Sequence, residues 1–164
     1  MKNRDFLKII IKQNKLEIIE ESEEVGRSYL GKSESNLISA KLLFENNLFE
    51  EAVSLAYYSM YNLVMSLFYR VGIKCENHSA SVFLLKDIFE LDNSSLFFAK
   101  KERLDKQYYT DFIIKKEEVK ELIQIAEDFN KNILGFIAKL DAGKVKLYRS
   151  KFLELLGGLK RCIK

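Results

Sequence analysis

The chain has 164 residues, which is enough for one compact domain with a full-sized core and too few to make two domains the better expectation. The absence of proline, the 7 glycines and the abundance of Leu, Ile, Lys, Glu and Ala favour long helices, so we expect a single all-α domain over residues 1–164. The net charge of +3 is weak and excludes recruitment of nucleic acid, membrane or acidic substrate by net charge alone.

The spacing of apolar residues predicts helices along the whole chain. A first, short helix is expected within residues 3–20, and a second one over about 23–46. A third, tyrosine-rich helix is expected over about 49–71, because Gly72 is well placed to end it in a left-handed conformation. No segment shows the alternation of polar and apolar residues that is typical of a strand.

The middle of the chain contains two further expected helices. Asn77 or Ser79 can cap the first of them, which continues to Leu91. A cluster of turn residues at 92–95 separates it from the next helix, for which we expect a break near Thr110.

The clearest periodicity lies in the last third of the chain. A stripe of apolar residues in steps of three and four consists of Val119, Leu122, Ala126, Phe129, Ile133 and Ile137. It predicts a packed bundle helix over about 115–140. The same stepping continues in an added C-terminal helix, which is expected to end at Gly157-Gly158 or just beyond. The whole pattern is that of an antiparallel, up-and-down helical bundle.

The segment from Ala52 to Tyr69 contains no charged side chain, and its length could cross a membrane if all its side chains were apolar. Several of them are polar, namely Ser54, Tyr57, Tyr58, Ser59, Tyr61, Asn62, Ser66 and Tyr69. Hydrocarbon would leave their hydroxyl and amide groups unpaired, so we expect no membrane span. A helix that is apolar on nearly every side must be covered on every side, which predicts a place at the centre of a bundle or at the interface of a homodimer.

Cofactor and targeting signals are absent from the sequence. Cys75 and Cys162 lack a partner spacing for zinc, and the N-terminal MKNRDFLKII lacks the apolar core of a signal peptide. We therefore expect a cytoplasmic protein with reduced thiols. The single histidine predicts no metal site, and the lack of a glycine-rich phosphate loop predicts no cofactor.

Three pieces occur in order along the chain. They are the segment 40–72, which contains YYSMY at 57–61, the loop NHS at 77–79, and RLDKQYYTDF at 103–112 followed by KKEEVKELIQIAEDFNKNI at 115–133. Together they resemble the HEPN superfamily of prokaryotic helical proteins, in particular its branch with a Tyr-Tyr-Ala-Met-aromatic signature. The resemblance covers roughly residues 34–140 and leaves both ends of the chain unassigned.

The resemblance implies a bundle of four or five antiparallel helices that commonly forms a dimer through its central helices. It also implies handling of nucleotides or RNA, often within a toxin–antitoxin pair that includes a small nucleotidyltransferase. The active ribonucleases of the superfamily carry an arginine and a histidine, separated by four to six residues, in a cleft at the dimer interface. Such a pair can activate the 2′-hydroxyl of RNA and stabilise the charge of the scissile phosphate.

This chain departs from the ribonuclease pattern. His78 is its one histidine, and the nearest upstream arginine is Arg70, with seven residues between them. In the related branch a histidine often follows the aromatic residue of the signature and an arginine comes three residues later, whereas this chain has Asn62 and Met65 there. We therefore favour a non-catalytic or weakened module that binds a protein partner, a nucleotide or RNA. The alternatives are a dimeric, metal-independent ribonuclease that uses Arg70 and His78, and a purely structural helical dimer.

Each candidate site residue also has a structural alternative. The candidates for a binding site or pocket are Tyr57, Tyr58, Tyr61, Asn62, Arg103 and Asp111. The tyrosines are also explained as core aromatics whose hydroxyls reach the rim of the bundle, and Arg103 and Asp111 as an ion pair across helices. His78 can be a helix-start residue whose pKa is lowered by the helix N-terminus, and Arg70 can extend from the helix end into solvent.

Overall fold

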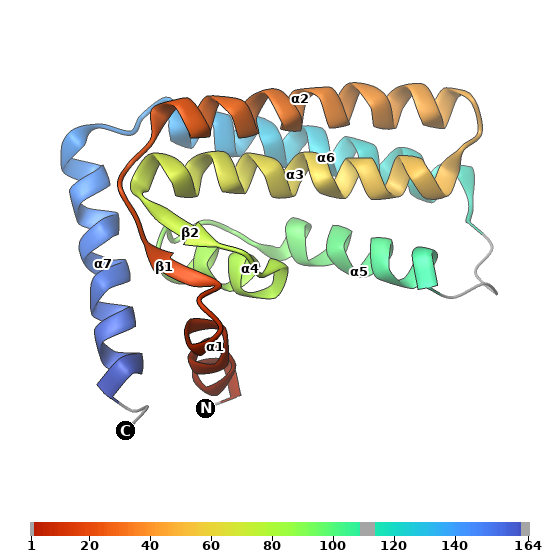
Figure 1. Cartoon of the computed structure of the whole chain (residues 1–164). Coiled ribbons are helices and arrows are strands. Elements are labelled where there is room, and N and C mark those ends of the chain that lie inside the picture. The colour runs from red at the N-terminus through yellow and green to blue at the C-terminus, as the bar shows by residue number, and fades with distance from the viewer. Residues whose placement is uncertain (1, 109–113, 162–164) are drawn as a thin grey trace.

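The computed structural model describes residues 2–108 and 114–161 and is a helical bundle. Its long helices are α2 (Glu23–Glu45), α3 (Phe49–Val71), α5 (Ser94–Tyr108) and α6 (Lys116–Ile137). Successive long helices run in opposite directions, with α2 above α3, α5 below it and α6 behind in the view of Figure 1. The predicted all-α, up-and-down bundle is therefore confirmed.

Shorter elements gather at one end of the bundle. β1 (Leu16–Ile18) and β2 (Ile73–Cys75) form a two-stranded antiparallel sheet, and α4 (His78–Asp87) follows β2. Helices α1 (Lys2–Lys12) and α7 (Ala142–Arg161) flank this sheet (Figure 1). Three positions singled out in the sequence, Thr110, Asp111 and Cys162, lie outside the described residues. No described helix is long and apolar enough to cross a membrane.

The small sheet shows that the prediction of a chain without strands was wrong. The helix expected within residues 3–20 ends at Lys12, and Asn14 has a positive φ of 55° where the chain turns toward β1. β1 then pairs with β2, with Leu16 opposite Cys75. Strands of three residues are too short to show alternation, and the pairing joins segments far apart in the sequence, so local periodicity could not reveal them.

The ends of the helices follow the sequence signals in part. α3 has the predicted bounds, and Gly72 ends it with a left-handed φ of 73°. α4 ends short of Leu91, in a turn where Glu90 has a positive φ of 58°. α7 runs through Gly157 and Gly158 to Arg161, because packing against the bundle outweighs the low helix propensity of glycine.

Small residues line the contact between α2 and α3 and recur every seven positions on each helix. They are Gly26, Ser33 and Ala40 on α2, and Ser66, Ser59 and Ala52 on α3. The hydroxyl of Ser33 donates to the carbonyl oxygen of Ser59 at 2.7 Å, and the hydroxyl of Ser59 donates to the carbonyl oxygen of Ser33 at 2.9 Å. The hydroxyl of Ser66 donates to the carbonyl oxygen of Gly26 at 2.7 Å. We call this contact the serine seam; it brings the two backbones close together because no large side chain separates them.

Helix α6 also contacts the serine seam. The amide of Asn130 donates to the hydroxyl of Ser59 at 2.7 Å, in a buried position. The predicted apolar stripe of α6 is buried at Val119, Leu122, Ala126, Phe129 and Ile133. The core therefore lies along α3, with α2 on one side and α6 on another.

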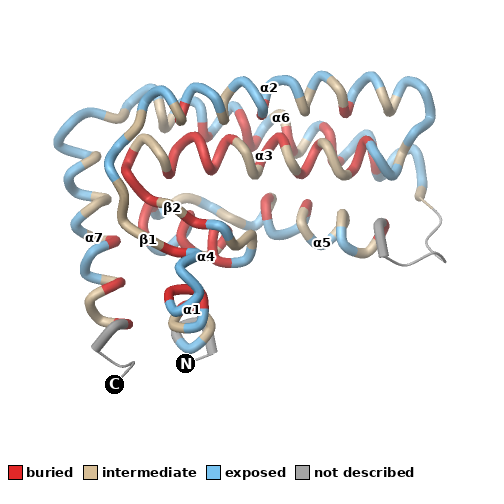
Figure 2. Tube along the Cα trace, in the orientation of Figure 1, coloured by how far each residue is buried: buried red, intermediate tan, exposed pale blue. Residues whose placement is uncertain are grey.

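α3 is the most deeply embedded helix of the bundle (Figure 2). Each residue from Ala52 to Val71 is buried or half-buried within the single chain. This confirms the predicted place at the centre of a bundle. The homodimer was expected partly because an apolar helix needs cover on all sides, and that need is met here by the same chain.

Arg149 fastens α7 to the end of the bundle. Its Nη1 donates to the carbonyl oxygens of Ile19 and Val71, both at 2.9 Å, and its Nε lies 3.3 Å from a carboxylate oxygen of Glu21. A Cβ atom at Gly72 would lie 1.7 Å from Arg149 Nη1 and 2.6 Å from the carbonyl oxygen of Ile19. Glycine is therefore needed at position 72 for space as well as for its positive φ.

A truncation on the buried stripe of α6 tests the core. We expect Phe129→Ala to lower the free energy of unfolding by roughly 3–5 kcal/mol, because it removes a large ring from a packed interior. Lys131→Ala, at an exposed position of the same helix, should cost under about 0.5 kcal/mol. Urea titration of both variants measures the difference, and equal effects would mean that another face of α6 carries the core.

A second substitution tests the serine seam. Ser59→Val removes the hydroxyl that accepts from Asn130 and adds bulk where two backbones meet. We expect a loss of at least about 2 kcal/mol in the free energy of unfolding, from unpaired buried groups and from overpacking. Ser35→Val, at an exposed position of α2, is the matched control and should cost under about 0.5 kcal/mol. A Ser59→Val protein as stable as the control in thermal unfolding would contradict the structural role of the seam.

Candidate functional site

Aromatic rings of α3 surround His78, the single histidine of the chain. Tyr61 stacks on the imidazole with ring centroids 4.0 Å apart and 2° between the planes. The centroid of Tyr57 lies 5.8 Å from that of His78, and Tyr58 meets the imidazole edge-on at 6.2 Å. Residues three and four apart lie side by side on a helix, so the spacing within YYSMY places these three tyrosines together. Four of the predicted site residues therefore form one cluster.

The start of α4 fixes the position of His78. The side chain of Asn77 accepts hydrogen bonds from the backbone N–H groups of Ser79 at 3.0 Å and Ala80 at 2.9 Å, so Asn77 is the cap. His78 is the first residue of the helix, as its structural alternative proposed. Its ring is nevertheless packed against α3, where it is half-buried.

A short hydrogen bond defines the tautomer of His78. The hydroxyl of Tyr57 lies 2.6 Å from His78 Nδ1. Tyr57 is fully buried, and burial raises the pKa of its hydroxyl, so the hydroxyl keeps its proton and needs an acceptor. Since Nδ1 is the acceptor that it meets, the neutral imidazole carries its own proton on Nε2. His78 can therefore donate from Nε2, and the lone pair on Nδ1 is already engaged.

Arg103 of α5 completes the cluster. Its Cζ lies 4.8 Å from the ring centroid of Tyr58 and 5.6 Å from that of Tyr57, which is cation–π geometry. Its Nε is buried and has no hydrogen-bond partner among the described residues. The proposed partner Asp111 lies outside the described part of the chain, so the ion pair between them stays a prediction.

The electrostatic surroundings keep His78 neutral. Burial lowers the pKa of the imidazole first, and the positive charges of Arg103 and Lys100 lower this pKa further. The sequence had indicated a lowered pKa through the N-terminus of the helix, whereas the causes found are burial and two cations of α5. Burial and Arg103 also lower the pKa of Lys100.

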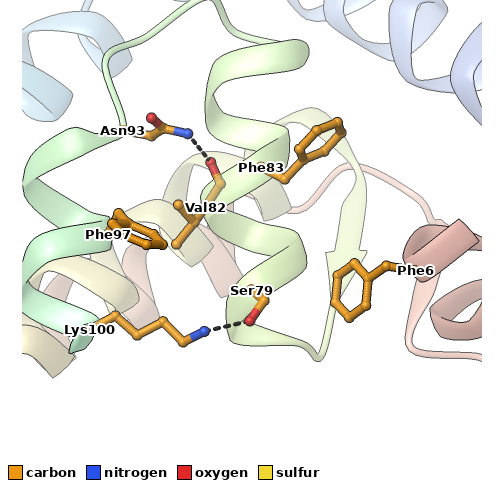
Figure 3. A pocket seen from close by; sticks show the side chains of 7 residues that line it. All are labelled: Phe6, Ser79, Val82, Phe83, Asn93, Phe97 and Lys100. Carbon is orange, nitrogen blue, oxygen red and sulfur yellow. Dashed lines mark hydrogen bonds between the residues drawn. The ribbon is translucent and has the colours of Figure 1, made fainter. Parts of the chain in front are cut away.

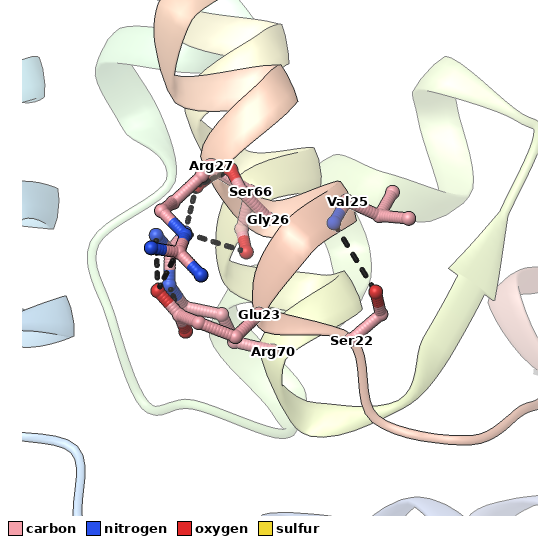
Figure 4. Close-up of polar contacts among 7 residues, drawn as sticks. All are labelled: Ser22, Glu23, Val25, Gly26, Arg27, Ser66 and Arg70. Atoms are coloured by element: carbon pink, nitrogen blue, oxygen red, sulfur yellow. Dashed lines mark hydrogen bonds and ion pairs between the residues drawn. The ribbon is translucent and has the colours of Figure 1, made fainter.

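Arg70 lies on the side of α3 that faces α2. Its Nε and Nη2 donate to the two carboxylate oxygens of Glu23 at 3.0 and 3.1 Å, and its Nη1 donates to the carbonyl oxygen of Ser66 at 3.2 Å (Figure 4). Its side chain is only 9% exposed, so it does not extend into solvent as its structural alternative proposed. A paired, bidentate guanidinium of this kind holds the start of α2 against the end of α3.

The predicted pair of Arg70 and His78 does not meet within one chain. Arg70 follows Tyr61, the residue that stacks on His78, by nine positions along α3. Nine positions correspond to two and a half turns and about 13.5 Å of rise, so the side chains of Tyr61 and Arg70 leave α3 in opposite directions. His78 stacks on Tyr61 and therefore lies away from Arg70. The arginine that lies beside His78 is Arg103.

A row of half-buried rings continues from this cluster along α3. Tyr29 of α2 stacks on Tyr69 with centroids 5.2 Å apart and 18° between the planes, and both interact electrostatically with the Tyr61 hydroxyl. We call these residues the tyrosine face: Tyr29, Tyr58, Tyr61, Tyr69 and His78, all of which are half-buried. Lys32 Nζ lies 4.9 Å from the ring centroid of Tyr29, at one end of the row. Arg103 lies beside Tyr58 at the other end, so one cation lies at each end of the row of rings.

Sequence reasoning placed some of these residues and missed others. Asn62 is half-buried on α3, and no ring contact or hydrogen bond among the described residues links it to the cluster. Tyr29, Tyr69 and Lys100 were not predicted as site residues. Tyr69 could have been predicted from the sequence, since it follows the Tyr57–Tyr61 signature by about two turns of the same helix. Tyr29 and Lys100 belong to other helices, α2 and α5, so local spacing could not place them at the site.

No group of three or more His, Cys, Asp or Glu side chains that could hold a metal ion occurs among the residues that the structure describes. The family model of the HEPN domain matches residues 27–134, a segment that includes all of α3, α4 and α5 and most of α2 and α6. No curated protein matches the chain. The family match covers well over half of the chain and contains the tyrosine face, His78 and Arg103. By this match, with the helical bundle that accompanies it, the chain belongs to the HEPN domain family.

Proposed function

We propose that this protein is a non-catalytic HEPN module that binds single-stranded RNA on its tyrosine face. The observation that carries the proposal is the row of half-buried rings, flanked by Lys32 at one end and by Arg103 at the other. Bases of a single strand stack on aromatic side chains, and nearby cations attract the phosphates. A chain with a net charge of only +3 needs such a local site to bind RNA.

The state of His78 supports binding without cleavage. A general base needs a free lone pair within reach of the 2′-hydroxyl. The Nδ1 atom of His78 is engaged by the Tyr57 hydroxyl at 2.6 Å, and the resulting tautomer has a proton on Nε2. In this tautomer the ring presents a donor to a phosphate oxygen and has no free lone pair for the proton of the 2′-hydroxyl.

A metal-independent ribonuclease is the second candidate, and the neighbourhood of His78 and Arg103 favours it. A histidine beside a guanidinium is the pairing that acid–base chemistry on a phosphodiester uses, and it would require the tautomer of His78 in which Nε2 has a free lone pair. A site that used Arg70 instead would need a second copy of the chain, because Arg70 leaves α3 in the direction opposite to Tyr61, on which His78 of α4 stacks.

Family membership supports three further parts of the proposal. We place the protein in the cytoplasm, as part of a toxin–antitoxin or stress system, with a small nucleotidyltransferase as a protein partner. A homodimer belongs to the same proposal. Since each residue from Ala52 to Val71 is already buried or half-buried in one chain, such a dimer would pair through surfaces that α3 contributes only in part.

RNA binding is tested with a labelled single-stranded oligouridine in fluorescence anisotropy. We expect Tyr58→Leu to weaken binding about tenfold, because it removes one stacking platform. Tyr148→Leu, on α7 and away from the tyrosine face, should leave the affinity unchanged. Lys32→Gln should reduce the slope of log K against log salt by about 0.7, whereas Lys120→Gln on the exposed side of α6 should not change it. Equal affinities for Tyr58→Leu and Tyr148→Leu would refute the tyrosine face as the RNA site.

Catalysis is tested by incubating the purified protein with single-stranded RNA in the presence of a chelator. We expect no cleavage above background, because His78 lacks a free acceptor nitrogen. Cleavage that disappears in His78→Gln and in Arg103→Gln, with folding intact, would establish the ribonuclease and locate it within one chain. Cleavage that depends on His78 and Arg70 would instead place the site between two chains.

A further inference from the structure

A cavity of about 250 Å³ opens between α1, α4 and α5. In Figure 3, Phe97 and Lys100 approach it from α5, Phe6 approaches from α1, and Ser79 and Val82 project from α4 between them. Phe6 precedes the segment 27–134 that the HEPN family model matches. The cavity is therefore a feature of this chain and not of the family domain alone.

The walls of the cavity are mainly apolar. Phe6, Val82, Phe83 and Phe97 line it, and Phe97 is 62% exposed although it is a large aromatic side chain. Asn93 also lines the cavity, but its side-chain amide donates to the carbonyl oxygen of Val82 at 2.8 Å and is engaged within the wall. An apolar ligand body would remove exposed aromatic surface from water at this place.

One cation faces the cavity. Lys100 Nζ donates a hydrogen bond to the hydroxyl of Ser79, and no carboxylate pairs with Lys100 in the part of the chain that the structure describes. Arg103 lies near enough to lower the pKa of Lys100. The charge at this side of the cavity is therefore positive. A partly buried ammonium group with a positive neighbour is stabilised by an anion.

We propose that this cavity binds a small carboxylate with an apolar, aromatic body. The carboxylate contacts Lys100 and the Ser79 hydroxyl, and the body lies among Phe6, Phe83 and Phe97. The volume is below the roughly 300–1,000 Å³ of drug-sized sites, so the ligand has about one ring and a short chain. This proposal goes beyond RNA binding and does not depend on it, because the tyrosine face and the cavity share no residue.

The experiment is calorimetric titration of the full chain with 3-phenylpropionate and with 3-phenylpropan-1-ol, which has the same body without the charge. We expect saturable binding of the acid and at least tenfold weaker binding of the alcohol. His78 supplies a second readout, since it is the one histidine and lies near Lys100: its imidazole proton signals should shift as the acid binds.

Three variants separate the contributions of charge and body. Lys100→Gln should reduce the affinity for the acid to that for the alcohol, and Phe97→Ser should weaken both probes. Lys101→Gln, at the exposed neighbouring position, should leave both affinities unchanged. Circular dichroism verifies that each variant is folded. Absence of saturable binding, equal affinities of the wild type for acid and alcohol, or an unchanged affinity for the acid in Lys100→Gln would each overturn the proposal.

Discussion

The exchange of hydrogen bonds between Ser33 and Ser59 is the constraint on which the rest of the structure depends. Each hydroxyl donates to the other residue's carbonyl oxygen, and Asn130 of α6 donates to the hydroxyl of Ser59. Hydrophobic packing is non-directional, so an apolar helix can in principle bury itself in several rotations and registers. The buried hydroxyls are satisfied in one of them, and they therefore fix how far α3 slides along α2 and how it is rotated.

That rotation determines which side chains of α3 face α2, which face the core and which remain partly open. The small residues and Arg70 face α2, the large apolar residues face the core, and Tyr58, Tyr61 and Tyr69 remain partly open. His78 can stack on Tyr61 because α4 starts beside this open side, at a point set by the Asn77 cap. The position of the polar side chains at this site thus follows from a packing contact on another side of the same helix.

The sequence predicted features whose signals are local. The bounds of α3, the role of Gly72 and the buried stripe of α6 each follow from residues within one or two helical turns. The two strands could not be predicted, because three residues show no pattern and their pairing joins distant segments. Arg103 was proposed but its place beside His78 was not, and Lys100 was missed, since their positions depend on how α5 packs. An uncharged helix also cannot indicate whether its cover comes from its own chain or from a second copy.

The contact between Arg149 and the turn at Gly72 has a consequence for how this architecture can change over time. Gly72 lies within the segment matched by the HEPN family and Arg149 lies beyond it, yet the guanidinium occupies the space that any side chain at position 72 would fill. A domain with another residue at that turn could not accept this C-terminal helix in the same place, because the guanidinium hydrogen-bonds to two carbonyl oxygens where the new side chain would lie. Recombination that joins the two parts from different parents therefore requires glycine at this turn in the parent that supplies the domain.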